Sequence, residues 1–262
     1  IDLTRWFEPD DRLPAELAVK DRVLAEHFDA AARLSPDTHN GQREVRDLIV
    51  EHLLRDHGAH YCRAGGAIEI VGADRTVAIA ADDPTPLLSA ARLVQDDLVL
   101  MRKTADGWTL AAAVLTAPSK WSLAEKINRN LDGIHDNVPG YAGRMASLMT
   151  RIFDQLQPMA PVERTNWSLY DDDVLFHPET KARPKRWSGP DGNFGLDAYI
   201  RVERQTLLKL PVTGDILFTI RVYVDPVAAF RRHPDGARMA AGLAAQIEGL
   251  DEGQARYKGL LA

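Results

Sequence analysis

Hydrophobic residues recur every three or four positions in two N-terminal segments, and this spacing predicts two amphipathic helices. The first covers Leu13–Phe28 and the second Gly41–His57. In the second, the apolar stripe is opposed by charged residues, as expected of a helix with one face on a core. Together these helices predict an N-terminal helical cap over residues 1–58.

After Gly58 the pattern changes to short β-favouring runs separated by turn residues. A helical stretch, Pro86–Arg92, divides them, and Ala105-Asp106-Gly107 is a hairpin turn signal. These features predict one small antiparallel sheet with helices on one face. The strands are expected at Ala67–Val71, Val77–Ala80, Leu98–Lys103 and Trp108–Leu115.

The second half of the chain again alternates between the two periods. Helical spacing returns at Ser122–Leu131 and Gly143–Leu156, and again after Pro226. The polar segment Glu163–Gly195 predicts a long loop that forms a lid or a pocket wall. The strand pair that follows it, within 199–224, has one fully apolar side that must face a core.

These elements predict an α+β fold. The strands before and after the central helices can complete one sheet, which favours a single domain over residues 1–262.

Composition excludes several classes of protein. There are 32 basic and 38 acidic residues, for a formal net charge of −6, so nucleic acid is not an expected partner. A single cysteine, Cys62, excludes an internal disulfide, a thiolate-only zinc site and covalent CxxCH haem attachment. No apolar run approaches the roughly 20 residues that cross a bilayer, and the first residues do not resemble a signal peptide. We therefore expect no membrane partner and a cytoplasmic location.

The eight histidines are the candidate metal ligands. His52, His57 and His60 have an irregular spacing near Gly58, which favours a solvated helix end over a metal site. His135 lies in a loop between apolar neighbours and before the stiff Pro139-Gly140 turn. The residues alone leave two interpretations open for it, a buried hydrogen-bonded side chain or a metal ligand. His177, before Pro178, is the second candidate ligand.

The segment 201–206 mixes charge with apolar residues. Alternation places Arg201, Glu203 and Gln205 on one side of a strand, and Val202, Arg204 and Thr206 on the other. One interpretation is a solvated sheet face with cross-strand pairing to Arg221. The other is the polar wall of a ligand cavity. Trp167 is likewise either a packing residue or an aromatic surface for a cationic ligand.

The chain carries no GxSxG, P-loop, GxGxxG or HExxH motif. Redox chemistry in this protein would therefore need electrons from another protein.

Three segments, in this order, resemble one family: PSKWSLAEKINRNLDGIHDNVPGY, ERTNWSLYDDDVLFHP and YIRVERQTLLKLPVTGDILFTIRVYVDP. They are similar to the haem-dependent oxidative N-demethylase alpha-subunit-like family. The resemblance implies a PAS-like antiparallel sheet with additional N-terminal, central and C-terminal helices, which holds haem b without a covalent bond. It also implies a separate NAD(P)H reductase and ferredoxin system as electron donor.

The activity that the resemblance implies is a monooxygenase reaction on a small methylated amine such as dimethylamine, which uses O2 and yields formaldehyde and the shortened amine. His135 would be the haem iron ligand, with His177 as the alternative. Glu203 would orient the cationic amine, and Trp167 or Tyr141 would form an aromatic wall. The haem propionates would meet Arg204 or Arg221.

Two other functions remain open from the sequence. A PAS-like fold also suits a haem or small-ligand sensor without turnover, although no output domain is recognisable. A haem-free interaction protein is the third alternative, and the colour of the purified protein separates it from the other two.

Overall fold

The computed structural model describes residues 1–119, 121–136, 138, 140–179, 195–258 and 260. Among the helices of this part of the chain, none combines the length and the apolar character that a bilayer crossing requires.

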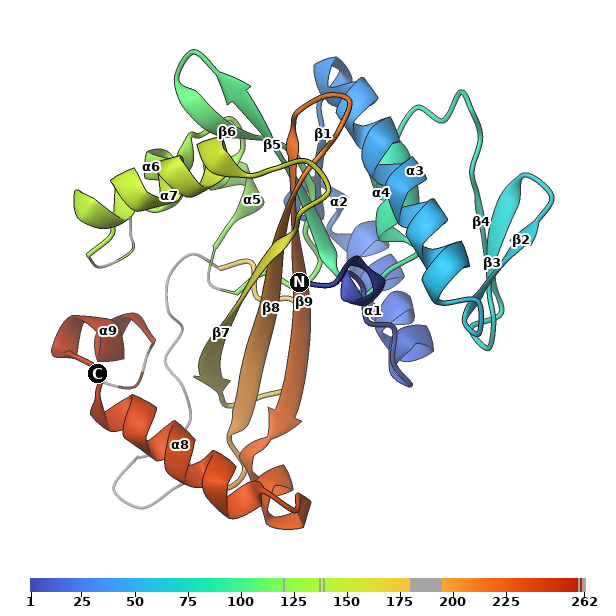
Figure 1. The fold of residues 1–262 in the computed structure, drawn as a ribbon. Coiled ribbons are helices and arrows are strands. Elements are labelled where there is room, and N and C mark those ends of the chain that lie inside the picture. The colour runs from blue at the N-terminus through green and yellow to red at the C-terminus, as the bar shows by residue number, and fades with distance from the viewer. Residues whose placement is uncertain (120, 137, 139, 180–194, 259, 261–262) are drawn as a thin grey trace.

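A six-stranded antiparallel sheet organises the molecule (Figure 1). Its strand order is β1-β6-β5-β9-β8-β7. The strands are β1 (Ala32–Leu34), β5 (Asp97–Thr104), β6 (Gly107–Val114), β7 (Val162–Tyr170), β8 (Tyr199–Lys209) and β9 (Ile216–Pro226). Along the chain, the strands β5 and β6 precede a group of helices, and the strands β7, β8 and β9 follow it. With β5 and β9 paired in the centre, the sheet is PAS-like. The predicted α+β fold is confirmed.

The prediction of one small sheet in the first half of the chain is wrong. A separate three-stranded sheet, β2-β3-β4, is built from β2 (Tyr61–Ala64), β3 (Ala67–Ile70) and β4 (Arg75–Ala78). The strands β5 and β6 belong instead to the main sheet, because β5 pairs with β9 rather than with β4. Alternation within a strand shows which side is apolar, but it does not specify a distant partner.

One face of the main sheet is covered by the N-terminal helices, which lie on the right in Figure 1. These are α1 (Leu13–Glu26), α3 (His39–Asp56) and α4 (Pro86–Ala91), with the short α2 (Phe28–Ala31) leading into β1. Their apolar stripes pack with Leu208 and Leu217 of the sheet to form the first core. The predicted N-terminal helices are confirmed, but the expected cap also supplies β1, which pairs with β6.

The opposite face is covered by the helices that connect β6 to β7. These are α5 (Leu123–Lys126), α6 (Leu131–Ile134) and α7 (Arg144–Gln155). Leu123, Leu131 and Phe153 pack on Ile220 and Val222 of β9 in the second core.

The predicted helix Ser122–Leu131 is divided into α5 and the start of α6. The backbone between them binds β6 instead of continuing a helix. Asn128 donates its N–H to the Leu110 carbonyl oxygen, and Leu110 donates to the Arg129 carbonyl oxygen. Asn128 also adopts a positive φ of 61°, which ends the helical path.

The segment Glu163–Gly195 is not a loop at its start, because β7 occupies it up to Tyr170. The first part of this strand, Val162–Asn166, is largely polar because it lies at the edge of the sheet, where its side chains remain accessible to water, whereas Leu169 and Tyr170 at its end are buried. Residues 180–194 of the predicted loop lie outside the described residues.

The hairpin predicted within 199–224 is confirmed as β8 and β9, although both faces of β9 contain buried residues. After β9 come a 3-10 turn (Val227–Arg232), α8 (Gly236–Glu248) and α9 (Glu252–Tyr257). Two further 3-10 turns lie at Leu3–Arg5 and Pro36–Thr38. Figure 1 shows α8 and α9 near the far ends of β7, β8 and β9, well separated from the N-terminal helices.

Candidate functional site

His135 caps the C-terminal end of α6 and is half-buried. Its Nδ1 atom lies 2.8 Å from the Leu131 carbonyl oxygen. Because a carbonyl oxygen can only accept, Nδ1 carries the proton and Nε2 keeps its lone pair. Within the described residues Nε2 has no hydrogen-bond partner. This is the arrangement of a metal-ligating imidazole whose second nitrogen is held by the protein.

Tyr141 holds the His135 ring from one side. The two rings are stacked, with their centroids 4.4 Å apart and an interplanar angle of 11°. Burial lowers the pKa of His135, so the imidazole is neutral at neutral pH. Burial also raises the pKa of Tyr141, and the nearby Asp132 carboxylate acts in the same direction. Burial and the neighbouring cationic side chains thus favour the neutral form of His135, which is the protonation state that can bind a metal.

A row of polar side chains crosses the sheet face below α6 and α7. We call it the polar row: Arg164 of β7, and Gln205, Glu203 and Arg201 of β8. Register shows that these residues share the face of the second core, because Gln205 and Glu203 lie opposite Ile220 and Val222 of β9.

The members of the polar row are connected to one another. Arg164 donates through Nε to Gln205 Oε1 at 2.7 Å, and Gln205 donates through Nε2 to Glu203 Oε2 at 3.0 Å. Arg201 Nε lies 3.7 Å from Glu203 Oε1. The remaining guanidinium nitrogens of Arg201 donate to the carbonyl oxygens of residues 117, 118 and 175. Since Arg201 is 1% exposed, the first of the two interpretations left open by the sequence, a solvated sheet face, does not hold for this side of β8.

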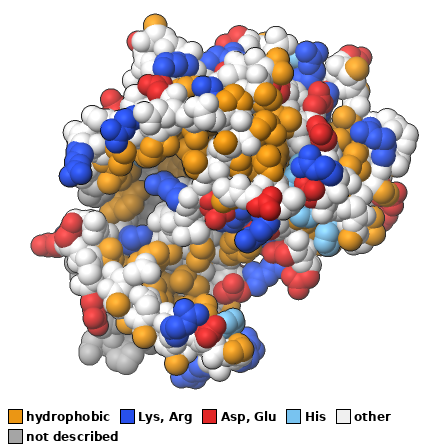
Figure 2. Space-filling model, viewed as in Figure 1, with side chains coloured by type: hydrophobic (Ala, Val, Ile, Leu, Met, Phe, Trp, Pro, Cys, Tyr) orange, Lys and Arg blue, Asp and Glu red, His pale blue; other side chains and the backbone are white. Residues whose placement is uncertain are grey.

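The molecular surface is recessed on the side of the molecule where α7, α8 and α9 lie. Figure 2 shows this recess between α7 and the pair α8 and α9, with hydrophobic side chains inside it and Lys or Arg side chains beside it. Charges act across it. The pKa of His135 is lowered mainly by burial and also by the positive charge of Arg164. The pKa of Tyr257 on α9 is raised mainly by burial and also by the Glu203 carboxylate. The polar row is therefore close both to His135 and to the C-terminal helices.

The apolar stripe of α7 extends beyond the core. Phe153 is buried in the second core and Met149 packs against it, whereas Met145 and Leu148 on the same stripe are 49% and 43% exposed. Other large apolar side chains are exposed on the elements that border the recess, among them Val162, Met239 and Tyr257. Exposed apolar surface gathered around a concavity is typical of a binding site for an apolar ligand.

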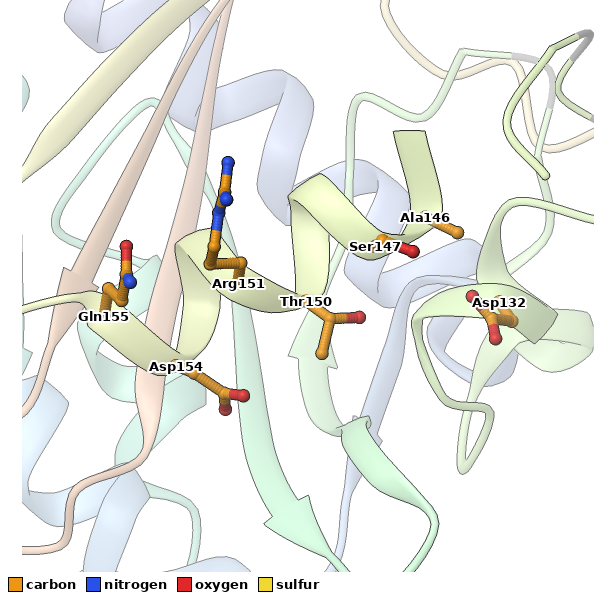
Figure 3. A pocket seen from close by; sticks show the side chains of 7 residues that line it. All are labelled: Asp132, Ala146, Ser147, Thr150, Arg151, Asp154 and Gln155. Carbon is orange, nitrogen blue, oxygen red and sulfur yellow. The ribbon is translucent and has the colours of Figure 1, made fainter. Parts of the chain in front are cut away.

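The polar side of α7 forms a different surface. Asp132 of α6 lies opposite Ser147 and Thr150 of α7, across a groove of about 570 Å³ (Figure 3). Arg151 and Asp154 also line it, so the groove is polar and carries both charges. Asp154 is already bound by Lys103 and by the Trp108 indole N–H. This groove is therefore less suited to an apolar ligand than the recess on the other side of the helix.

Arg204 and Arg221 lie on the opposite face of the sheet from His135. Their register pairs them with each other, on the side of the first core. Arg204 binds Glu163 and the backbone carbonyls of Arg5 and Trp6. Arg221 binds Asp10 and Glu16 at 2.8 and 2.6 Å. These two arginines, expected to meet propionates, are thus occupied inside the protein and away from the recess.

Trp167 also lies on the face of Arg204, because it is opposite Val202 in the β7–β8 register. Its ring is covered by the Lys258 ammonium of α9, 4.4 Å from the ring centroid. Lys258 additionally donates to the Trp167 carbonyl oxygen. The contact attaches α9 to the edge strand of the sheet, which is a role that the sequence did not indicate.

His177 is buried and differs from His135 in its Nε2 atom. This nitrogen lies 3.0 Å from the Asp172 carboxylate, and the ring stacks on Tyr170 at 4.9 Å. The ligating position of a neutral imidazole is therefore more accessible at His135.

His52 is not at a solvated helix end, as the sequence predicted, but is 2% exposed. Its Nε2 accepts a hydrogen bond from the Phe7 N–H, and Asp56 lies 2.9 Å from Nδ1. Within the described residues, no group of three or more His, Cys, Asp or Glu side chains could hold a metal ion.

The family assignment agrees with this geometry. The sequence model of the family described as "Haem-dependent oxidative N-demethylase, alpha subunit-like" matches residues 1–262, the whole chain. The chain belongs to the haem-dependent oxidative N-demethylase alpha-subunit-like family.

Proposed function

We propose that this protein binds haem b in the recess through His135 and oxidatively demethylates a small methylated amine such as dimethylamine. The observation that carries the proposal is the half-buried His135 side chain, whose Nδ1 is held by a backbone carbonyl while Nε2 has no hydrogen-bond partner among the described residues. The family description, which names haem and oxidative N-demethylation, supports the same chemistry.

The residues around the recess fit a haem. A non-covalent haem needs one axial ligand, apolar side chains against the macrocycle and cations near its two carboxylates. His135 can provide the ligand, Met145 and Leu148 the apolar contact, and the polar row the positive charge. Cys62, the one cysteine, is not part of a CxxCH motif, so the haem would be of the b type.

A bound haem would supply the one-electron and dioxygen chemistry that hydroxylates an N-methyl carbon, after which formaldehyde leaves. The contribution of the protein is to hold, orient and exclude water. The Leu131 carbonyl fixes the His135 tautomer, and the Tyr141 ring fixes the plane of the imidazole. The apolar side chains of α7 would keep water from the reacting carbon.

Glu203 is the proposed amine-binding residue. Its carboxylate is oriented by the Gln205 amide, and the side chain is 12% exposed. Because Arg201 already offsets part of its charge, Glu203 would accept a hydrogen bond from the substrate N–H rather than act as an isolated anion. Tyr141, in contact with His135, would lie on the ligand side of the haem rather than beside the amine. Trp167 would act through Lys258, by holding α9 at the edge of the recess.

Electrons would come from a separate reductase and ferredoxin system. The absence of a GxGxxG motif in the full sequence supports this part of the proposal.

The test combines spectroscopy and product analysis. The wild-type protein reconstituted with haem is compared with the His135→Ala, His177→Ala and Glu203→Gln variants, all checked for folding by circular dichroism. His135→Ala should lose or strongly shift the Soret band, and added imidazole should restore it, whereas His177→Ala should keep it. Glu203→Gln should keep the haem spectrum but weaken the spectral change caused by dimethylamine.

Formaldehyde release from dimethylamine, with an artificial reductant under air, tests turnover. An unchanged Soret band in His135→Ala would reject the ligand assignment. Tight CO or O2 binding without formaldehyde would favour a sensor over an enzyme.

A further inference from the structure

Arg164 has an unusual position among the cations of the recess. It is exposed on the edge strand β7, but its Nε is fixed by the 2.7 Å hydrogen bond to Gln205 Oε1. Within the described part of the chain, its two terminal nitrogens have no hydrogen-bond partner. A guanidinium held by Nε presents its remaining donors in a fixed plane, and this arrangement suits a carboxylate.

Among the described residues, two other cations in or beside the polar row, Arg201 and Lys258, are already engaged. Arg201 is buried and donates to three backbone carbonyls. Lys258 is half-buried, covers the Trp167 ring and donates to the Trp167 carbonyl oxygen. Arg164 thus differs from both in having donors directed to solvent.

The local charge favours an anion. Three cations, Arg164, Arg201 and Lys258, surround one carboxylate, Glu203. The Glu203 carboxylate lies 3.7 Å from Arg201. It also opposes the lowering of the Lys258 pKa by burial. The Arg164 guanidinium is near residues on both sides of the recess. Its charge lowers the pKa of His135 at the end of α6 and opposes the rise in the pKa of Tyr257 on α9. An anion bound to Arg164 would therefore lie at the rim of the recess, close to the His135 ring.

We propose that Arg164 is the carboxylate-binding residue of the recess and pairs with one propionate of the bound haem through its two terminal nitrogens. This inference rests on the proposed function. Arg164 takes the role of propionate partner that the sequence suggested for Arg204 or Arg221. Those two arginines bind acidic side chains and backbone carbonyls on the other face of the sheet.

Gln205 gives the pairing a second consequence. Its Oε1 accepts from Arg164, which directs its Nε2 toward Glu203. Arg164 therefore also positions the Glu203 carboxylate, and the carboxylate-binding residue and the amine-binding residue are joined by one amide.

The experiment compares two ligands that differ in their carboxylates. The haem-free protein is titrated with haem and with haem dimethyl ester, and binding is followed by absorbance and by quenching of tryptophan fluorescence. The variants are Arg164→Ala and Arg164→Lys, with Arg151→Ala as the matched control on the polar side of α7.

Arg164→Ala should weaken haem binding by about 10-fold to 100-fold, as expected for the loss of a charged hydrogen-bonded pair. It should change the affinity for the diester by less than about 2-fold, because no charged pair is lost there. Arg164→Lys should recover part of the haem affinity, and Arg151→Ala should leave both affinities unchanged.

An equal loss for both ligands in Arg164→Ala would overturn the inference, since it would indicate a structural effect. So would an unchanged haem affinity. Either result leaves the ligand assignment intact if His135→Ala still loses its Soret band, whereas wild-type protein that binds no haem would reject the proposed function and this inference together.

Discussion

The two faces of the main sheet use the same residue types in different ways. On the face of the first core, arginines are closed into ion pairs: Arg221 is 1% exposed and binds two carboxylates. On the face of the second core, Arg164 is exposed and fixed only at Nε. In the first arrangement the terminal guanidinium nitrogens are bound inside the protein, and the second leaves donors for a ligand.

This difference shows that charge content does not identify a binding residue. Arg204 and Glu203 are neighbours on β8, yet alternation sends them to opposite faces. On one face the charge stabilises the attachment of the N-terminal segment through Arg5 and Trp6. On the other it borders an apolar recess.

Removal of Arg221 should have the largest effect on stability. Arg221→Ala would leave Asp10 and Glu16 without their cation, at a cost of roughly 3–5 kcal/mol in the free energy of unfolding. Urea denaturation of the haem-free protein measures it. Arg164→Ala is the matched change on the open face and should cost less than about 0.5 kcal/mol. Equal losses in the two variants would contradict the distinction between the faces.

The apolar stripe of α7 offers a comparison with one residue type. Leu156, which caps the C-terminal end of α7, is 6% exposed, and Leu148 is 43% exposed. Leu156→Ala should cost about 2–5 kcal/mol, because it opens a cavity in the second core. Leu148→Ala should leave the urea midpoint nearly unchanged but weaken haem binding. A large loss of stability in Leu148→Ala would show that this part of the stripe belongs to the core.

A smaller effect concerns pH on the closed face. Burial lowers the pKa of His52 from 6.5 to about 4. Between these values the unfolded chain takes up a proton that the folded protein does not, so the free energy of unfolding falls as the pH is lowered from about 6.5 to about 4. His52→Gln keeps an acceptor for the Phe7 N–H but does not titrate.

Urea denaturation at pH 7.5 and pH 5 should therefore show a fall that is roughly 1–2 kcal/mol larger in the wild type than in His52→Gln. Two other groups also contribute to the pH dependence of stability: burial lowers the pKa of His57 and raises the pKa of Asp96 to about 6. Both are present in the two proteins, so their contributions cancel in the comparison. Equal pH dependence would mean that His52 does not titrate in this range.

Much of this protein follows from its sequence alone. The period of the apolar residues determines the N-terminal helices, α7 and the hairpin of β8 and β9, because each of these elements has a stripe or a side long enough to specify its own burial. The order of three segments determines the family. His135 was the first candidate ligand from its local neighbours, and this assignment stays a prediction.

The tertiary structure decided what depends on partners distant in sequence. Polar β7 becomes a strand only because β8 offers it a hydrogen-bonding edge. The sequence indicated that strands before and after the central helices join in one sheet, but only the structure separates β2, β3 and β4 into a sheet of their own. It also decided which arginine faces the recess. The physical reason is register: a shift of one position exchanges the two faces of a strand, and local composition does not reveal which face a distant helix will cover.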